Sequence, residues 1–366
     1  MRRKFYAVVI DEIRDETPDV FSLFFRNPDP GLFTYLPGQY LTIRLRKNGE
    51  DLRRCFSLSS SPFCDDRLCV TIKRIPGGVV SNVLRDEFKV GDSLEIMPPM
   101  GNFAVEINPV FPRHYILIGG GSGITPLMSI LKSVLTAEPG SEVSLWYANR
   151  TETDIIFRDE IQLLQRKYKD RLFLHLTLSQ PDPKWKGFSG RLDKNCIYDR
   201  VSEVFMTSEL RKVYYICGPE GMISGAMAAL EKHAVNPADI HRELYTTSAP
   251  DEQAETPAEV PVETVLSDGE ETYTLQTQKI RVILDGEKHE ISVSPDQVIL
   301  RAAIKADLDP PFACQSGICT TCRAMLYAGI VSMDETEGLS EEELNEGYIL
   351  TCQSHPLTAD VEIEYR

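Results

Sequence analysis

The sequence predicts a multidomain fold with an antiparallel β-barrel, an α/β domain built on a parallel sheet, and a small α+β module at the C-terminus. Residues 1–110 hold short β-prone runs separated by turn residues, whereas residues 111–247 alternate apolar strands with helical segments. Four of the nine cysteines lie between residues 314 and 352. With 366 residues, the chain is long enough for two or three domains of ordinary size.

Charge separates the chain into unequal parts. The net charge is −16, which argues against nucleic-acid binding because that function requires a basic surface. Residues 1–247 are nearly neutral, whereas residues 279–366 carry 16 acids and 7 bases. Between them, residues 248–278 hold eight acids, no base and three prolines, so we expect an acidic flexible linker there.

Neither a targeting signal nor a membrane span is expected. The basic residues Arg2 and Arg3 are followed by an apolar run of six residues, 5–10, which is shorter than the roughly 7–15 of a signal peptide. The longest uncharged run, residues 115–131, contains four glycines and a proline. An odd cysteine count without a signal peptide indicates a reducing compartment, so we expect a cytoplasmic protein with no membrane or nucleic-acid partner.

Regular elements follow from these patterns in chain order. A short helix at residues 81–87 interrupts six barrel strands, which are expected at residues 4–12, 20–26, 40–46, 55–59, 68–75 and 93–97. The alternation of strands and helices in the second domain indicates a parallel sheet whose strands are connected by helices. Its strands are expected at residues 114–118, 143–148, 172–178 and 213–217, and its helices at residues 125–136, 157–168 and 221–233.

The C-terminal cysteines have the spacing C-x4-C-x2-C with a distant fourth, which is typical of plant-type [2Fe–2S] proteins. Four thiolates must converge on two irons, so one loop supplies three and a separate segment supplies the fourth. A zinc site or four free thiols are alternatives, but structural zinc sites usually pair their cysteines in two short knuckles. Gly317 relieves crowding in the loop, and the expected ligands are Cys314, Cys319, Cys322 and Cys352.

Residues 280–366 as a whole resemble a plant-type ferredoxin. A hairpin at residues 279–293, a helix at residues 297–306 and a strand at residues 361–365 are expected around the cysteine loop. The resemblance implies a β-grasp-like α+β domain over residues 279–366 that carries one [2Fe–2S] cluster.

Residues 53–57, Arg-Arg-Cys-Phe-Ser, resemble the flavin signature R-x-Y-[ST] of the ferredoxin–NADP reductase superfamily. The resemblance implies that Arg54 neutralises the flavin phosphate, that Phe56 lies against the isoalloxazine, and that Ser57 sits near N5, which accepts hydride. Phe56 replaces the usual tyrosine, so a hydroxyl is lost. Gly78 and Ser81 match the family's G-x-x-S at a helix start, a natural pyrophosphate site that favours FAD over FMN.

Two glycine-containing turns are similar to the family's nicotinamide-binding motifs. Residues 119–126 follow an apolar strand and open a helix, where backbone amides can meet a pyrophosphate. Residues 217–222 match C-G-P-x-x-M, whose cysteine lies beside the nicotinamide, although a small buried cysteine is the alternative. Tyr245 and Glu243 stand where relatives place an aromatic and an acid next to the flavin, and Tyr245 could equally be an ordinary surface aromatic. The implied nucleotide-binding residues are Gly121, Gly123, Thr125, Cys217, Gly218, Pro219, Met222 and Tyr245, and the implied catalytic residues are Ser57, Cys217 and Glu243.

The choice between NADPH and NADH stays open. Arg150 could bind a 2′-phosphate, and Lys186 and Arg191 are further candidates. The family often reads NADPH with Ser-Arg after the next strand. This chain has Ser179-Gln180 there, which weakens the NADPH case without supplying the acid expected for NADH. We lean towards NADPH.

The order of the parts resembles the reductase components of multicomponent oxygenases, and residues 149–150 and 155–157 add a likeness to those that serve phenylacetyl-CoA epoxygenases. The resemblance implies an NAD(P)H-dependent enzyme that passes electrons through FAD and the cluster to a partner oxygenase. Flavin would accept a hydride pair and release it singly. One alternative is that the electrons go to another acceptor, such as a Rieske oxygenase, a desaturase or a hybrid-cluster protein. The chain could also be a flavin reductase whose cluster is only structural, or a non-enzymatic redox sensor.

Overall fold

Six strands form the first sheet of the computed structural model, which describes residues 4–27, 29–47, 49–245, 265–268 and 271–365. Their order is β4-β3-β6-β1-β2-β5. A bridge between Leu58, directly after β4, and Val70 in β5 joins the two edges and closes the predicted barrel. The elements are β1 (Tyr6–Thr17), β2 (Val20–Arg26), β3 (Tyr40–Lys47), β4 (Glu50–Ser57), β5 (Arg67–Lys73), β6 (Ser93–Ile96) and the helix α1 (Val79–Asp86).

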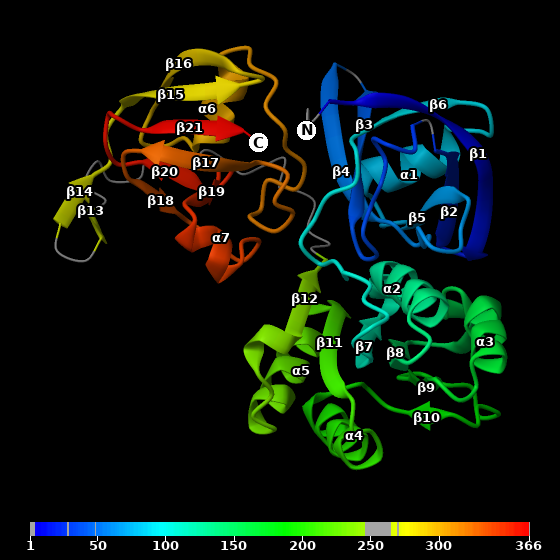
Figure 1. Cartoon of the computed structure of the whole chain (residues 1–366). Coiled ribbons are helices and arrows are strands. Elements are labelled where there is room, and N and C mark those ends of the chain that lie inside the picture. The colour runs from blue at the N-terminus through cyan, green and yellow to red at the C-terminus, as the bar shows by residue number, and fades with distance from the viewer. Residues whose placement is uncertain (1–3, 28, 48, 246–264, 269–270, 366) are drawn as a thin grey trace. The chain divides into compact units, whose positions relative to one another are not determined.

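All six strands of the second sheet run parallel, in the order β10-β9-β8-β7-β11-β12. Alternate residues of β7 join different cores. Tyr115 and Leu117 pack with α2 and α3, whereas Ile116 and Ile118 pack with α4 and α5. Helices therefore cover both faces of the sheet (Figure 1). The elements are β7 (Arg113–Gly120), α2 (Ile124–Ala137), β8 (Glu142–Asn149), α3 (Arg158–Lys167), β9 (Leu172–Leu178), β10 (Phe188–Ser189), α4 (Lys194–Thr207), β11 (Arg211–Gly218), α5 (Glu220–Lys232) and β12 (Ile240–Leu244).

The C-terminal sheet has the order β16-β15-β21-β17-β19. Its first strand in the chain, β15, pairs in parallel with its last, β21, and antiparallel with β16. The helix α6 packs on the sheet through Ile299, Ala302 and Ala303, which supports the β-grasp-like expectation. The elements are β15 (Gln278–Leu284), β16 (Glu287–Val293), α6 (Ile299–Lys305), β17 (Arg323–Ala328), β18 (Val331–Met333), α7 (Glu341–Asn345), β19 (Tyr348–Leu350), β20 (Ser354–Pro356) and β21 (Glu362–Tyr365).

A small hairpin stands within the segment that was expected to be a flexible linker. Strand β13 (Val265–Asp268) pairs antiparallel with β14 (Glu271–Thr274), and β15 already begins at Gln278. The run Thr272-Tyr273-Thr274 has high β propensity, which outweighs the acidic composition that suggested a linker. Residues 248–264 and 269–270 of the expected linker lie outside the described residues.

By their contacts, the described residues group into a larger unit, within residues 6–43 and 56–247, and a smaller unit, within residues 1–5, 44–55 and 248–366. The tip of the β3–β4 hairpin thus groups with the C-terminal sheet. The predicted division at residues 110, 247 and 278 stays a prediction. Within the described ranges, no helix combines the length and the apolar character needed to cross a bilayer.

Candidate functional site

Five polar side chains of the larger unit meet at the carboxyl end of the parallel sheet. The Ser57 hydroxyl oxygen lies 2.5 Å from the Tyr245 hydroxyl and 3.3 Å from Glu243 Oε2. The Tyr245 hydroxyl also lies 2.8 Å from Thr125 Oγ1, and Cys217 Sγ lies 4.0 Å from Glu243 Oε2. Four segments that are far apart in sequence therefore bring their predicted site residues into one connected group, which we call the serine–glutamate cluster.

Glycine allows the segments around this cluster to approach closely. A Cβ added at Gly123 would lie 2.1 Å from the Cys217 carbonyl oxygen, and one added at Gly120 would lie 2.7 Å from Pro219 Cδ. Gly218 has a φ of 155°, which a larger residue rarely adopts. A side chain at these positions would push the β7–α2 turn away from the end of β11, where Cys217 lies.

Burial leaves the serine–glutamate cluster without a formal charge at neutral pH. It raises the pKa of Glu243 to about 8, although the hydrogen bond from Ser57 acts in the opposite direction. Burial also raises the pKa of the Cys217 thiol and of the Tyr245 phenol, and the nearby Glu243 carboxyl adds to both shifts. Cys217, Glu243 and Tyr245 therefore keep their protons at neutral pH, and the cluster gains a negative charge when Glu243 ionises.

The other flavin-motif residues lie on β4 and at the start of α1. Arg54 and Phe56 precede Ser57 on β4, and Arg54 Nη1 donates to the Arg53 carbonyl oxygen at 2.8 Å. Gly78 is the N-cap of α1, and Ser81 Oγ accepts a hydrogen bond from the Ile75 amide at 3.2 Å. Ser81 thus supports the turn that leads into α1, whose first amides have no intrahelical partner.

Among the candidates for coenzyme selection, Arg150 directly follows β8, and Lys186 and Arg191 lie on either side of β10. The Arg150 carbonyl accepts a hydrogen bond from the Gln180 amide at 2.8 Å. Arg150 therefore lies beside the position where the family often carries Ser-Arg. The side chains of Arg150, Lys186 and Arg191 are all exposed.

The four expected cluster ligands form two pairs in the smaller unit. The Cys314 amide lies 3.4 Å from Cys319 Sγ, and the Cys319 amide lies 3.4 Å from Cys314 Sγ. The Cys322 carbonyl oxygen accepts hydrogen bonds from the Thr351 amide at 3.3 Å and the Thr351 hydroxyl at 2.9 Å, which brings the neighbouring Cys352 close to Cys322. In the described part of the chain, no three potential ligands converge as a single metal ion requires. Two pairs of thiols instead suit a dinuclear cluster with two cysteines at each iron.

The cysteine loop also directs backbone amides towards sulfur. The Ser316 amide lies 3.4 Å from Cys314 Sγ. Gly317 has a φ of 76°, and a Cβ there would lie 2.9 Å from the Glu335 Cβ atom. Amides directed at sulfur stabilise bound thiolates and tune the reduction potential of a cluster. The residues present therefore fit a [2Fe–2S] cluster.

Arg53 is a residue that the sequence analysis missed. In the smaller unit, its guanidinium donates to Asp309 at 2.5 Å and to the Pro310 carbonyl at 3.1 Å, and it lies 4.1 Å from the centre of the Phe312 ring. Those three residues lead into the cysteine loop at Cys314. The contact joins positions about 250 apart in the chain, so no local sequence pattern marks it.

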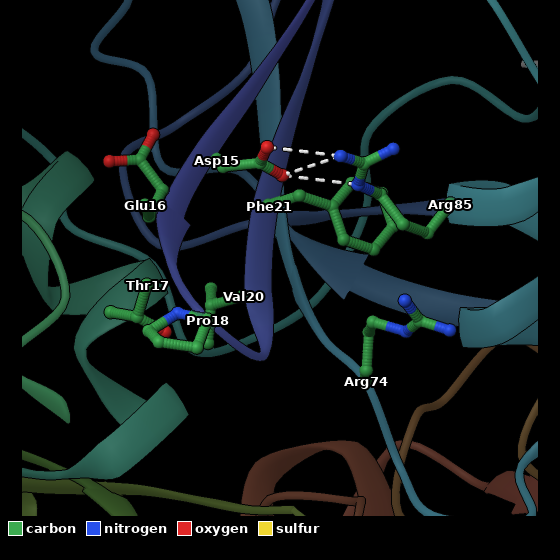
Figure 2. Close-up of a pocket in the computed structure, with 8 residues that line it drawn as sticks. All are labelled: Asp15, Glu16, Thr17, Pro18, Val20, Phe21, Arg74 and Arg85. Atoms are coloured by element: carbon green, nitrogen blue, oxygen red, sulfur yellow. Dashed lines mark hydrogen bonds and ion pairs between the residues drawn. The ribbon is translucent and has the colours of Figure 1, made fainter.

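A separate cavity of about 310 Å³ lies at the β1–β2 turn (Figure 2). The two arginines that line it are both engaged by carboxylates, Arg85 by Asp15 and Arg74 by Asp86. The predicted site residues do not line it. The lining residues are Asp15, Glu16, Thr17, Pro18, Val20, Phe21, Arg74 and Arg85.

Three known families match the chain in the order that the sequence predicts. An oxidoreductase FAD-binding domain matches residues 7–105, and an oxidoreductase NAD-binding domain matches residues 117–228. A 2Fe-2S iron-sulfur cluster binding domain matches residues 282–357. These matches confirm the prediction that the protein is an oxidoreductase and the predicted classes of cofactor.

Relatives resemble this chain over nearly its whole length. One subunit of the 1,2-phenylacetyl-CoA epoxidase of Escherichia coli is 33% identical over 99% of this chain and 98% of its own. The ferredoxin reductase component of the 3-ketosteroid-9-alpha-monooxygenase of Rhodococcus rhodochrous is 33% identical over 98% of this chain and 96% of its own. A glycine betaine monooxygenase reductase subunit of Pseudomonas aeruginosa is 32% identical over 97% of this chain and 93% of its own.

Solved structures share the fold. The structure of phthalate dioxygenase reductase matches with a TM-score of 0.59 and 21% identity, over 99% of this chain and 98% of its own. The predicted multidomain fold class is thereby confirmed. The chain belongs to the ferredoxin reductase superfamily, in the branch that combines FAD-, NAD- and [2Fe–2S]-binding domains in one polypeptide.

Proposed function

We propose that this protein is the reductase component of an oxygenase system, which oxidises NAD(P)H and passes the electrons to a partner oxygenase. The observation that carries the proposal is the presence, in one chain, of the serine–glutamate cluster and two pairs of cluster cysteines. Similarity over nearly the full length to a subunit of an epoxidase and to the reductase components of two monooxygenases supports it. The odd cysteine count remains the argument for a reducing compartment such as the cytoplasm.

The bound cofactors supply the redox chemistry, and the chain supplies position and charge. Arg54 and the start of α1 at Gly78 and Ser81 would hold the flavin phosphates, and Phe56 would lie against the flavin ring. Arg150 would face the 2′ position of the adenosine. The nicotinamide half of the coenzyme would be held by Gly121, Gly123, Thr125, Cys217, Gly218, Pro219 and Met222.

At the reacting centre, this chain would control protons and charge. Ser57, Tyr245 and the protonated Glu243 would keep hydrogen-bond donors beside the position that receives hydride. Cys217 would fill the space next to the nicotinamide without adding a charge. Neutral side chains suit this place, because a fixed negative charge would oppose the arrival of a hydride.

Among possible partners, we favour a phenylacetyl-CoA epoxygenase, because this chain resembles the E. coli epoxidase subunit over nearly the full length of both proteins. The 3-ketosteroid and glycine betaine relatives make other monooxygenases the alternative partners. The test is to reconstitute the protein with each purified oxygenase and measure product formed per NAD(P)H consumed. Coupled turnover with the epoxygenase alone is expected. Coupling with another oxygenase only would overturn the choice of partner, and no NAD(P)H turnover at all would favour a redox sensor.

Flavin reduction should depend on pH through Glu243. Because the pKa of Glu243 is raised to about 8, the carboxyl is protonated below that pH and ionised above it. We expect the limiting rate of flavin reduction to be flat below pH 8 and to fall by about tenfold above it, since a carboxylate there opposes hydride arrival. Stopped-flow measurements between pH 6 and 9.5 check this, and Glu243→Gln should remove the step. A step that survives in Glu243→Gln would assign it to another group.

Electron delivery to a basic acceptor should weaken as salt rises. The acidic residues after the cysteine loop include Glu341 and Glu342, which are exposed on α7. Charges on a surface are screened beyond about 8 Å at physiological ionic strength, so steering by them is lost in high salt. Reduction of cytochrome c should therefore slow with added NaCl, while flavin reduction by NAD(P)H stays nearly constant.

The variant that tests this steering is Glu341→Lys with Glu342→Lys, which should flatten the salt dependence. Glu343 is left unchanged, because it forms a capping box with Ser340 and an ion pair with Arg323, so its reversal would disturb α7. The exposed acids Glu209 and Glu231 of the larger unit provide a matched control of equal charge change. An unchanged salt profile in the α7 variant would show that these carboxylates do not guide docking.

A further inference from the structure

The helix α2 and the segment that follows Ser57 are joined by polar contacts over three helical turns. In the first turn, Thr125 reaches Ser57 through the Tyr245 hydroxyl. One turn later, Ser129 Oγ donates to the Ser60 carbonyl oxygen at 2.5 Å. Both Ser129 and Ser60 are almost fully buried, so these contacts are shielded from water.

The next turn continues the same register with buried hydroxyls. Ser133 Oγ donates to the Ser129 carbonyl oxygen and lies 2.7 Å from Ser61 Oγ, which itself accepts from the Phe63 amide. The hydrogen bonds therefore run in one direction: the Phe63 amide donates to Ser61, Ser61 donates to Ser133, and Ser133 donates to the Ser129 carbonyl. Ser61 and Ser133 have no exposed surface, so a slip of α2 along the segment would leave unpaired polar groups in the interior.

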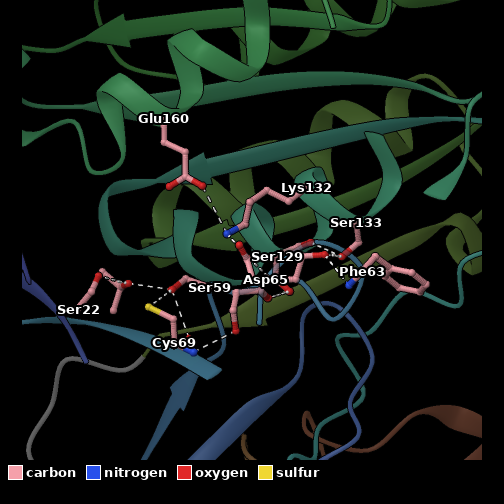
Figure 3. Close-up of polar contacts among 12 residues, drawn as sticks. Ser22, Ser59, Phe63, Asp65, Cys69, Ser129, Lys132, Ser133 and Glu160 are labelled. Carbon is pink, nitrogen blue, oxygen red and sulfur yellow. Dashed lines mark hydrogen bonds and ion pairs between the residues drawn. The ribbon is translucent and has the colours of Figure 1, made fainter. Parts of the chain in front are cut away.

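Ion pairs of a buried lysine close the series. Lys132, on the same face of α2, lies 2.6 Å from Asp65 Oδ2 and 3.4 Å from Glu160 Oε1 on α3 (Figure 3). The Asp65 carboxylate also accepts from the Ser61 amide at 2.7 Å. Burial alone would lower the pKa of Lys132, but the two carboxylates outweigh it and hold the pKa above its usual value. Lys132 is therefore a charged group whose side chain is only 10% exposed.

We propose that Lys132 is a positioning residue for hydride transfer, which locks the register between α2 and residues 57–65. The proposal rests on the function proposed for the serine–glutamate cluster. Ser57 would stand at the flavin, and α2 begins at the turn that packs against Cys217. The register between them thus sets the separation of the two reacting rings. A displacement of about 1 Å in such a site can cost on the order of 100-fold in rate.

Lys132→Met tests this role because methionine keeps the apolar stem of lysine and removes its charge. We expect the limiting rate of flavin reduction per bound FAD to fall about tenfold, with coenzyme Kd and FAD content changed less than about twofold. Lys132→Arg should retain most of the rate, because it keeps a cation for Asp65 and Glu160. The matched control is Lys169→Met at an exposed position of the same unit, which should behave like the wild type.

Hydrogen exchange measured by mass spectrometry on the same holoproteins gives a readout that is independent of activity. In Lys132→Met, amides of residues 58–66 and of α2 should exchange faster, while those of β1 and β2 stay unchanged. Unchanged exchange and an unchanged rate per bound FAD would overturn the proposal. A loss of FAD with a normal rate in the remaining holoprotein would also overturn it, because Lys132 would then only stabilise the fold. If the wild-type flavin is not reduced by NAD(P)H, the proposed function itself fails, which is a separate outcome.

Discussion

Replacing Cys319 by serine is expected to remove the iron–sulfur cluster and to end electron delivery to cytochrome c. The Cys319 and Cys314 sulfurs each lie near the other's backbone amide, so the two thiols form one of the two ligand pairs. A serine oxygen is a poor substitute for a thiolate at iron, which prefers soft ligands in such clusters. Iron should fall from about two per chain to near zero, and cytochrome c reduction should fall by on the order of 100-fold or more.

Hydride transfer should survive the same change. NAD(P)H–ferricyanide activity and bound FAD are expected to stay within about twofold of the wild type, because the serine–glutamate cluster belongs to the larger unit. Cys64→Ser, at an exposed cysteine outside the loop, is the control. Full iron content in Cys319→Ser would remove this residue from the ligand set. Full cytochrome c reduction without iron would indicate that the cluster is only structural.

Replacing Cys217 by alanine should slow flavin reduction by about ten- to 100-fold while FAD stays bound. Cys217 is fully buried at the end of β11, and its sulfur lies 4.0 Å from Glu243 Oε2. Alanine leaves a space where the nicotinamide would be held, so the coenzyme would bind in less productive positions. Stopped-flow bleaching of the flavin with excess NADH or NADPH measures the effect.

A cysteine elsewhere in the same unit controls for general effects of the substitution. Cys196 lies on α4, outside the serine–glutamate cluster, so Cys196→Ala should leave flavin reduction unchanged. If the limiting rate of flavin reduction in Cys217→Ala equals that of the wild type, Cys217 has only a packing role.

The sequence predicts most of the strands because they are short apolar or alternating runs bounded by turn residues. The helix α4 was missed, since its buried residues Ile197, Val201 and Val204 form only a narrow stripe. One local signal could have found it. The Asp193 carboxylate accepts hydrogen bonds from the amides of Asn195 and Cys196, as an N-cap does.

The site is predicted unevenly for a related reason. Motifs predict the cysteines and Ser57 as site residues, because the expected chemistry requires fixed residue types at fixed spacings. They leave Tyr245 ambiguous, and the structure places its hydroxyl between Ser57 and Thr125. Lys132 and Arg53 carry no motif, because each acts through partners that only the tertiary fold brings near. Contacts of that kind follow from packing between elements and leave no local pattern in the sequence.

Electron transfer from NAD(P)H through the flavin to the cluster is tested most directly by anaerobic mixing of the wild-type protein with excess NADH or NADPH, followed by absorbance and by electron paramagnetic resonance of rapidly frozen samples. We expect the flavin to bleach first and the signal of a reduced [2Fe–2S] cluster then to appear in the same molecules, without any added mediator. A flavin that becomes fully reduced beside an intact cluster that stays oxidised would contradict this expectation.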